Sequence, residues 1–229
     1  FGMDEAVRSL LSLRPVEAVL ACLSEWTDED EQHAFIEAVK ASPTYRRFPP
    51  PLAYEKSVWK KMIESTEKKM KPCSDSVYEH YSSLLQRGVA GGGGAGEECG
   101  YKSYTITQCE AAAAGLHLVD DWCVTIKVER HTRHVGMTTW EAGLLLAEYC
   151  ITHPDVVKNK DVIELGSGLG MIAPVLYSFS SPSSLYLTDY AEEVVSNMEY
   201  NVDINRSEKC EMKTVHTGVL DWEKPASLS

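Results

Sequence analysis

The first eighty-odd residues show the apolar spacing of amphipathic helices. Segment 27–42 places four apolar residues at helical spacing, behind a Thr27 and Asp30 pair with the spacing of a capping box. Pro49 to Pro51 interrupt the pattern, because consecutive prolines cannot donate to a helix. Two further apolar stripes, Trp59 to Met70 and Val77 to Leu85, follow the break. The pattern predicts a small all-helical unit.

The second half of the chain has a different pattern. Two runs rich in Thr, Tyr, Val and Ile, 101–106 and 122–130, predict the strands of a hairpin, whereas their connection, 107–121, gives no assignable pattern. Segment 138–150 predicts a helix that is capped at Thr138. Its expected buried side chains are Leu144, Leu145, Ala147 and Tyr149.

From Asp161 onward, strand and helix patterns alternate. The expected strands are 161–165, 184–189 and 211–220, and the expected helices are 169–179 and 191–205. Alternation of this kind is typical of right-handed crossover units on a parallel sheet. The predicted fold class is therefore α/β, with a helical N-terminal domain before the first part of a Rossmann-like sheet.

A glycine-rich segment separates the two patterns. Residues 88–98, "GVAGGGGAGEE", are expected to form a flexible linker, which predicts domains at 1–87 and 99–229. A phosphate-binding loop of the G-x-x-x-x-G-K-[ST] type is the competing interpretation. It is excluded because Glu97 follows Gly96.

Charge and cysteine content narrow the possible partners. Lys and Arg number 22 and Asp and Glu number 34, a net charge of −12, which disfavours nucleic acid and anionic lipid and favours a basic protein partner. The seven cysteines form no C-x-x-C pair, so we expect reduced thiols, no metal site and a cytoplasmic protein. No run has the length of a membrane span. The first residue, Phe1, is not methionine, and an incomplete N-terminus is expected.

The stretch "DVIELGSGLG", Asp161 to Gly170, is the main candidate for chemistry. In a parallel sheet the ligand lies beyond the carboxyl ends of the strands, where these glycines expose bare backbone. A dinucleotide site would require a third glycine where Met171 stands. The observed spacing, E-x-G-x-G-x-G from Glu164, resembles the first motif of class I S-adenosylmethionine-dependent methyltransferases. A dinucleotide binder remains the alternative.

Two further residues follow the next two strands. Asp189 ends the second strand about twenty residues after the turn. At this place its carboxylate can accept hydrogen bonds from both hydroxyls of a ribose. Its alternative role is to cap the following helix. Trp222 follows the third strand, and it either stacks on an adenine ring or packs over the edge of the sheet.

A longer resemblance makes the class more specific. The segments "ASPTYRRFPPPLAYEKSVWKKMIE" and "GMTTWEAGLLLAEYCITHPDVVKNKDVIELGSGLGMIAPVL" resemble the eukaryotic elongation factor 2 protein-lysine N-methyltransferase family, which has the seven-strand class I fold. The resemblance implies S-adenosylmethionine as cofactor and elongation factor 2 as protein substrate. It also implies the cofactor-binding set Trp140, Glu164, Gly166, Gly168, Gly170, Asp189 and Trp222. Trp140 has an alternative role as an anchor of its own helix.

The resemblance does not extend to a catalytic residue. Relatives carry a D-x-x-Y motif at the end of their fourth strand. This sequence reaches only "LDWEKPASLS", just after the third strand, so a C-terminal truncation is expected. A non-catalytic binding module and a small-molecule methyltransferase are therefore kept as alternative functions. A partial sheet would also leave an edge and apolar faces uncovered.

Other polar residues are interpreted as surface. Glu192 and Glu193 are expected on a solvated helix face, and His131 and His134 in a loop. Asn197, Asn201 and Asn205 share one helical face, which is expected to be a solvated stripe, with hydrogen bonding along a groove as the alternative.

Overall fold

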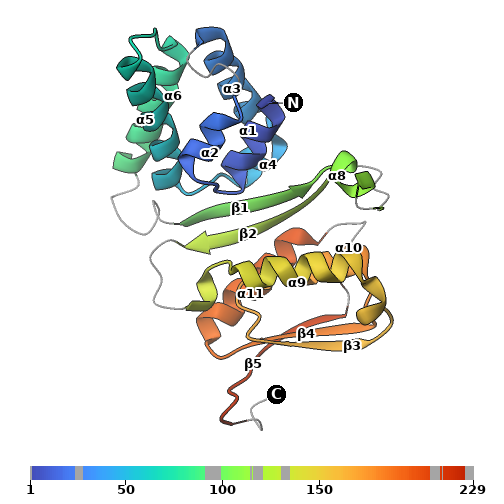
Figure 1. Ribbon diagram of the computed structural model, residues 1–229. Coiled ribbons are helices and arrows are strands. Elements are labelled where there is room, and N and C mark those ends of the chain that lie inside the picture. Colours follow the sequence, from blue (N-terminus) through green and yellow to red (C-terminus); the bar gives the residue numbers. More distant parts are fainter. Residues whose placement is uncertain are drawn as a thin grey trace. The chain divides into compact units, whose positions relative to one another are not determined.

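The computed structural model describes residues 2–23, 28–90, 99–113, 115, 121–129, 135–206, 212 and 214–224. The chain divides into two compact units, Phe1–Thr105 and Ile106–Ser229, coloured blue to green and green to red in Figure 1. Helix α6 extends to Ala90, so the first three residues of the expected linker are helical. Residues 91–98 lie outside the described part, where the linker stays a prediction.

The first unit is helical, as the apolar spacing predicted. Its helices are α1 (Gly2–Leu11), α2 (Val16–Ala21), α3 (Glu29–Ala41), α4 (Pro43–Arg47), α5 (Leu52–Lys68) and α6 (Asp75–Ala90), followed by strand β1 (Cys99–Ile106). The core of this unit contains Phe35 and Trp59, both fully buried, with ring centroids 5.2 Å apart. Tertiary packing of the amphipathic faces therefore stabilises these helices.

Two details of the first unit differ from the expectation. The cap of α3 is Asp28, whose carboxylate accepts the backbone N–H of Glu31 at 3.2 Å, whereas Thr27 lies outside the described residues. Met70 does not belong to the buried stripe of α5: the helix ends at Lys68, and Met70 is 94% exposed with a φ of +53°. Helical periodicity does not report the position of a helix end.

The second unit is the α/β part. Its elements are α8 (Gln108–Ala113), β2 (Trp122–Glu129), the 3-10 helix η1 (Val135–Met137), α9 (Glu141–Thr152), the 3-10 helix η2 (Pro154–Val156), β3 (Asp161–Leu165), α10 (Ile172–Phe179), β4 (Ser184–Asp189), α11 (Glu192–Asn205) and β5 (Val215–Val219). Strands β3, β4 and β5 form a parallel sheet in that order. The expected alternation of strand and helix is confirmed, and the segment between β1 and β2 contains a helix that the pattern did not reveal.

The two faces of the sheet are covered differently. Helices α9, α10 and α11 lie on the same side, where Leu185 and Leu187 of β4 are fully buried (Figure 1). On the other side Ile163, Leu165 and Tyr186 are each about half exposed, and Ile163 pairs with Tyr186 in the parallel register. These side chains form a continuous exposed apolar patch, as expected for a partial sheet. Among the described residues, no helix combines the length and hydropathy needed to cross a bilayer.

Helix α9 differs from its prediction in both its start and its buried side. Its N-cap is Trp140 without a side-chain hydrogen bond, so the expected cap at Thr138 is wrong. Ala147 and Cys150 are buried, whereas Leu145 is 68% exposed and Leu144 and Tyr149 are also exposed. The Cys150 carbonyl accepts Ser180 Oγ at 3.0 Å. The helix is apolar on most sides, so periodicity could not select the small-residue face that packs toward α10.

The three asparagines of α11 pair with the edge of β2, so the expected solvated stripe is wrong. Asn205 accepts the Thr125 N–H at 2.9 Å and donates to the Thr125 carbonyl at 2.7 Å. Asn201 accepts the Lys127 N–H at 2.8 Å and donates to the Leu169 carbonyl at 3.0 Å. These amides satisfy backbone groups that would otherwise form an unpaired strand edge.

We expect Asn201→Ala to destabilise the second unit by about 2 kcal/mol, because it leaves the part-buried Lys127 N–H and the buried Leu169 carbonyl without these partners. Asp203 is the matched control on the same helix, since it is exposed and forms only a surface ion pair with Arg206. Asp203→Ala should change the free energy of unfolding by about 0.5 kcal/mol or less. Urea unfolding followed by circular dichroism measures both, and equal effects would refute the role of Asn201.

Candidate functional site

The turn after β3 requires glycine for conformational reasons. Gly166, Gly168 and Gly170 have φ values of +70°, +54° and +71°, in the left-handed region that other residues avoid. Ser167, between them, ties the turn to β4: its N–H donates to the Thr188 carbonyl at 2.8 Å, and its Oγ accepts the Thr188 N–H at 3.1 Å. Glycine thus occupies every second position of the turn because every second residue has a positive φ.

Gly170 has a packing role in addition to its conformation. A β-carbon at this position would lie 2.6 Å from Cγ of Met198 on α11. Gly170 therefore permits the close approach of helix and turn, and it does not line the cavity described below. Its expected contact with a cofactor stays a prediction.

Gly170→Ala is expected to destabilise the second unit by about 2 kcal/mol, through left-handed strain and the overlap with Met198. Gly218 on β5 is the matched control, because a β-carbon there would have no neighbour within 4 Å. Gly218→Ala should leave the melting temperature within about 1 °C of the parent protein. Thermal unfolding measures both, and an unaffected Gly170→Ala variant would contradict the packing role.

The carboxylate of Asp189 is held against the glycine turn. Its Oδ2 accepts the Gly168 N–H at 2.9 Å, and its Oδ1 accepts the Tyr190 N–H at 2.8 Å. The following helix, α11, has Ala191 as its N-cap and no side-chain cap, so the alternative that Asp189 caps this helix is wrong. A carboxylate has about four acceptor positions, and two of those on Asp189 remain for a ligand.

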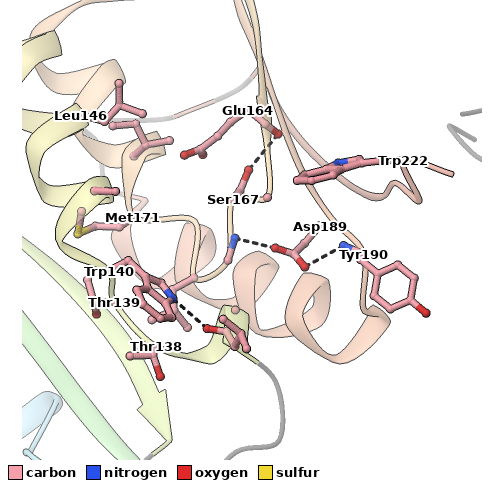
Figure 2. Close-up of a pocket in the computed structure, with 18 of the residues that line it drawn as sticks. Thr138, Thr139, Trp140, Leu146, Glu164, Ser167, Met171, Asp189, Tyr190 and Trp222 are labelled. Atoms are coloured by element: carbon pink, nitrogen blue, oxygen red, sulfur yellow. Dashed lines mark hydrogen bonds between the residues drawn. The ribbon is translucent and has the colours of Figure 1, made fainter.

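A cavity of about 810 Å³ lies at the carboxyl ends of β3 and β4, within the size range of cofactor sites. Figure 2 shows most of the residues that line it. Six of the seven expected residues are among them: Trp140, Glu164, Gly166, Gly168, Asp189 and Trp222. Sequence reasoning missed the wall residues Thr138, Thr139, Leu146, Ser167, Met171 and Tyr190. Only their proximity to motif residues could have indicated them.

Two tryptophans border this cavity. Trp140 is 58% exposed and its Nε1 donates to the Val135 carbonyl at 3.0 Å, an arrangement that argues against a buried anchor of α9. Trp222 is 68% exposed, and its Cζ2 lies 3.6 Å from the position a β-carbon would take on Gly166. Both indoles therefore present accessible ring surface at the cavity, where a flat aromatic group can stack.

Glu164 is the most strongly perturbed acid at the cavity. Burial, reinforced by the negative charge of Asp189, raises the pKa of its carboxyl to about 7. Its Oε2 is buried and has no hydrogen-bond partner, and the same is true of Thr139 Oγ1. Two such groups at one cavity indicate a ligand that supplies the missing partners, because a buried unpaired polar atom is costly. A cationic N–H group would suit the carboxylate best.

The site fits a compact nucleoside cofactor with a cationic group. The glycine turn exposes backbone, and Asp189 offers two acceptor positions. Glu164 has one buried oxygen without a partner, and Leu146 and Met171 supply apolar walls. No group of three His, Cys, Asp or Glu residues within the described part of the chain is placed to hold a metal ion. The parallel order of β3, β4 and β5 and the cavity at their carboxyl ends are consistent with a Rossmann-like methyltransferase fold.

Comparison with known proteins agrees with this class. Residues 119–228 match the family described as lysine methyltransferase. The chain is 24% identical over 225 residues to the human protein-lysine N-methyltransferase EEF2KMT, covering 95% of this chain and 63% of the relative. It is 27% identical over 227 residues to the human putative protein N-methyltransferase FAM86B2, with the same coverage.

A fungal relative extends the comparison. The chain is 26% identical over 165 residues to the protein-lysine N-methyltransferase EFM3 of Chaetomium thermophilum, covering 68% of this chain and 47% of the relative. Residues 119–228 are therefore similar to lysine methyltransferases, and the chain as a whole is similar to relatives that are named protein-lysine N-methyltransferases. It spans less than two thirds of the length of these curated relatives.

Proposed function

We propose that this protein is a protein-lysine N-methyltransferase that binds S-adenosylmethionine in the 810 Å³ cavity. The observation that carries the proposal is the presence at one cavity of two carboxylates: that of Asp189, which accepts the Gly168 N–H, and that of Glu164, whose Oε2 is buried without a partner. A sugar diol and an ammonium group are the two features of this cofactor that such carboxylates recognise. The sequence comparisons with named lysine methyltransferases support the same class.

Each residue of the site has an expected part in holding the cofactor. Asp189 accepts hydrogen bonds from the ribose hydroxyls, and Glu164 accepts one from the ammonium group. Gly166 and Gly168 let the ligand lie against the backbone, and Trp140 and Trp222 exclude water from its two ends. When bound, S-adenosylmethionine supplies a methyl group on a positively charged sulfur.

The substrate of the proposed reaction is a lysine side chain of elongation factor 2, the protein to which the resemblance points. The lysine nitrogen must be unprotonated to accept a methyl group, and its pKa in water is about 10.4. The protein therefore has to desolvate this amine or offer an acceptor for its proton. We therefore also propose a cytoplasmic location, because translation factors act there.

Calorimetric titration of the purified chain with S-adenosylmethionine tests the cofactor, with NAD as the control for a dinucleotide. We expect saturable binding of S-adenosylmethionine and none of NAD. Transfer of a labelled methyl group to purified elongation factor 2, located by mass spectrometry, then tests the reaction. The absence of binding would refute the cofactor proposal, whereas binding without transfer would favour the non-catalytic module.

A further inference from the structure

A second cavity, of about 670 Å³, lies between β2 and the first turns of α11. The 3-10 helix η1 separates it from the first cavity: Val135 and Gly136 line the first and Met137 lines the second. The residues that matter for its chemistry are Lys127, Glu129, Met137, Glu192, Asn197 and Tyr200. None of them takes part in the proposed cofactor site.

One buried atom of this cavity lacks a partner. Asn197 is 6% exposed, and its Nδ2 donates to the Lys127 carbonyl at 3.4 Å. Its Oδ1 is buried and accepts no hydrogen bond. The other two asparagines of this helix face, Asn201 and Asn205, use both ends of their amides. A buried acceptor without a partner is costly, so we expect a hydrogen-bond donor that is not among the described residues to bind the Asn197 oxygen.

The charge around this oxygen selects the kind of donor. Among the described residues that line the cavity, Glu129, Glu192 and Glu193 carry negative charge and Lys127 carries positive charge, which gives a formal charge of −2. Lys127 Nζ lies 3.7 Å from Glu129 and 5.6 Å from the centroid of the Tyr200 ring. These contacts indicate how a second cation would be held, between a carboxylate and an aromatic ring.

The geometry favours an organic cation over a metal ion. Within the described ranges, no three acidic, His or Cys side chains converge as metal ligands would. Met137 is nearly buried and adds an apolar surface, against which a flexible stem can lie. A guanidinium group has five N–H donors in a plane and can reach an amide oxygen and a carboxylate together.

We propose that this cavity docks an arginine side chain of a protein partner. The stem lies along Met137, and the guanidinium donates to Asn197 Oδ1 and to the carboxylate of Glu192. The net charge of −12 attracts a basic protein surface to this chain over a longer range. Since η1 borders both cavities, a partner held here lies next to the candidate cofactor site without occupying it.

The test uses the whole chain without cofactor, so it is independent of methyl transfer. Amide spectra of the isotope-labelled protein are recorded during titration with N-acetyl-arginine amide, and with the citrulline compound as the uncharged isostere. We expect the Asn197 side-chain signals to shift in a saturable way with the arginine probe alone. A dissociation constant in the millimolar range is expected for a single side chain. Equal shifts with citrulline would overturn the proposal, as would no shift.

Matched variants separate the cavity from general charge attraction. Glu192→Gln is expected to weaken binding of the arginine probe about fivefold, whereas Glu148→Gln, an exposed position on α9, changes the net charge equally and should have no effect. Equal weakening by both variants would overturn the proposal. Spermidine binding that is tighter than that of arginine-containing peptides would identify a polyamine as the occupant and refute a protein partner. Binding only after Arg130 and Arg133 are replaced by serine would assign the cavity to this chain's own residues.

Discussion

Asp189→Ala is expected to lower the affinity for S-adenosylmethionine about 100-fold. The carboxylate has two acceptor positions left after it binds the N–H groups of Gly168 and Tyr190, and a vicinal diol fills both. Each hydrogen bond to a charged acceptor contributes about 1.5–3 kcal/mol, and about 1.4 kcal/mol corresponds to a factor of ten. Loss of the carboxylate also removes the brace on the Gly168 N–H, so the turn becomes less well ordered for the ligand.

The affinity of Asp189→Ala is measured by calorimetry and compared with that of two control variants. Asp189→Asn keeps one acceptor oxygen and is expected to lose about tenfold in affinity. Asp203→Ala, on the exposed side of α11, should bind the cofactor like the parent protein. Circular dichroism must show that the second unit is folded in each variant. Unchanged binding by a folded Asp189→Ala variant would mean that Asp189 braces the turn but does not contact the cofactor.

Glu164→Gln is expected to stabilise the free protein and to weaken its binding of the cofactor. The pKa of the carboxyl is about 7 in the folded state and near 4.5 when unfolded. As pH rises from about 4.5 to 7, the unfolded chain loses this proton while the folded chain retains it, so the folded state becomes relatively less stable. The glutamine variant has no such titrating group, so it does not lose this stability as pH rises. It should be more stable than the parent protein at pH 8 by at most about 3 kcal/mol, with little difference near pH 4.5.

The affinity for the cofactor should depend on pH in the opposite way to the stability of the free protein. An ionised Glu164 pairs with the ammonium group, so the affinity of the parent protein should rise as pH increases from 6 to 8. The glutamine variant should bind about tenfold more weakly at pH 8 and show a flatter dependence on pH. Titrations at several pH values, combined with thermal unfolding, measure both effects. Glu148→Gln is the control of equal charge. A variant that loses stability and keeps its affinity would refute the assignment of Glu164.

The elements of the fold could largely be predicted from the sequence. Alternating apolar patterns located β3, β4 and β5, and helical spacing located α3 and α11, because these patterns reflect burial on one face. The buried side of α9 could not be predicted. Its leucines fit several faces equally well, and the contact of Cys150 and Ser180 with each other selects the face that is buried.

The glycine spacing and Asp189 could be located by motif, since each requires a particular residue at a particular strand end. The walls of the cavity and the raised pKa of Glu164 could not be predicted, because both depend on segments distant in sequence.

The sequence by itself determined where the chain turns and which residues face the carboxyl end of the sheet, since backbone conformation and side-chain period are local properties. The tertiary structure alone decided that Asn201 and Asn205 close a strand edge and that Glu164 and Asn197 each keep a buried oxygen without a partner. Desolvation and hydrogen-bond pairing arise only when distant segments pack together.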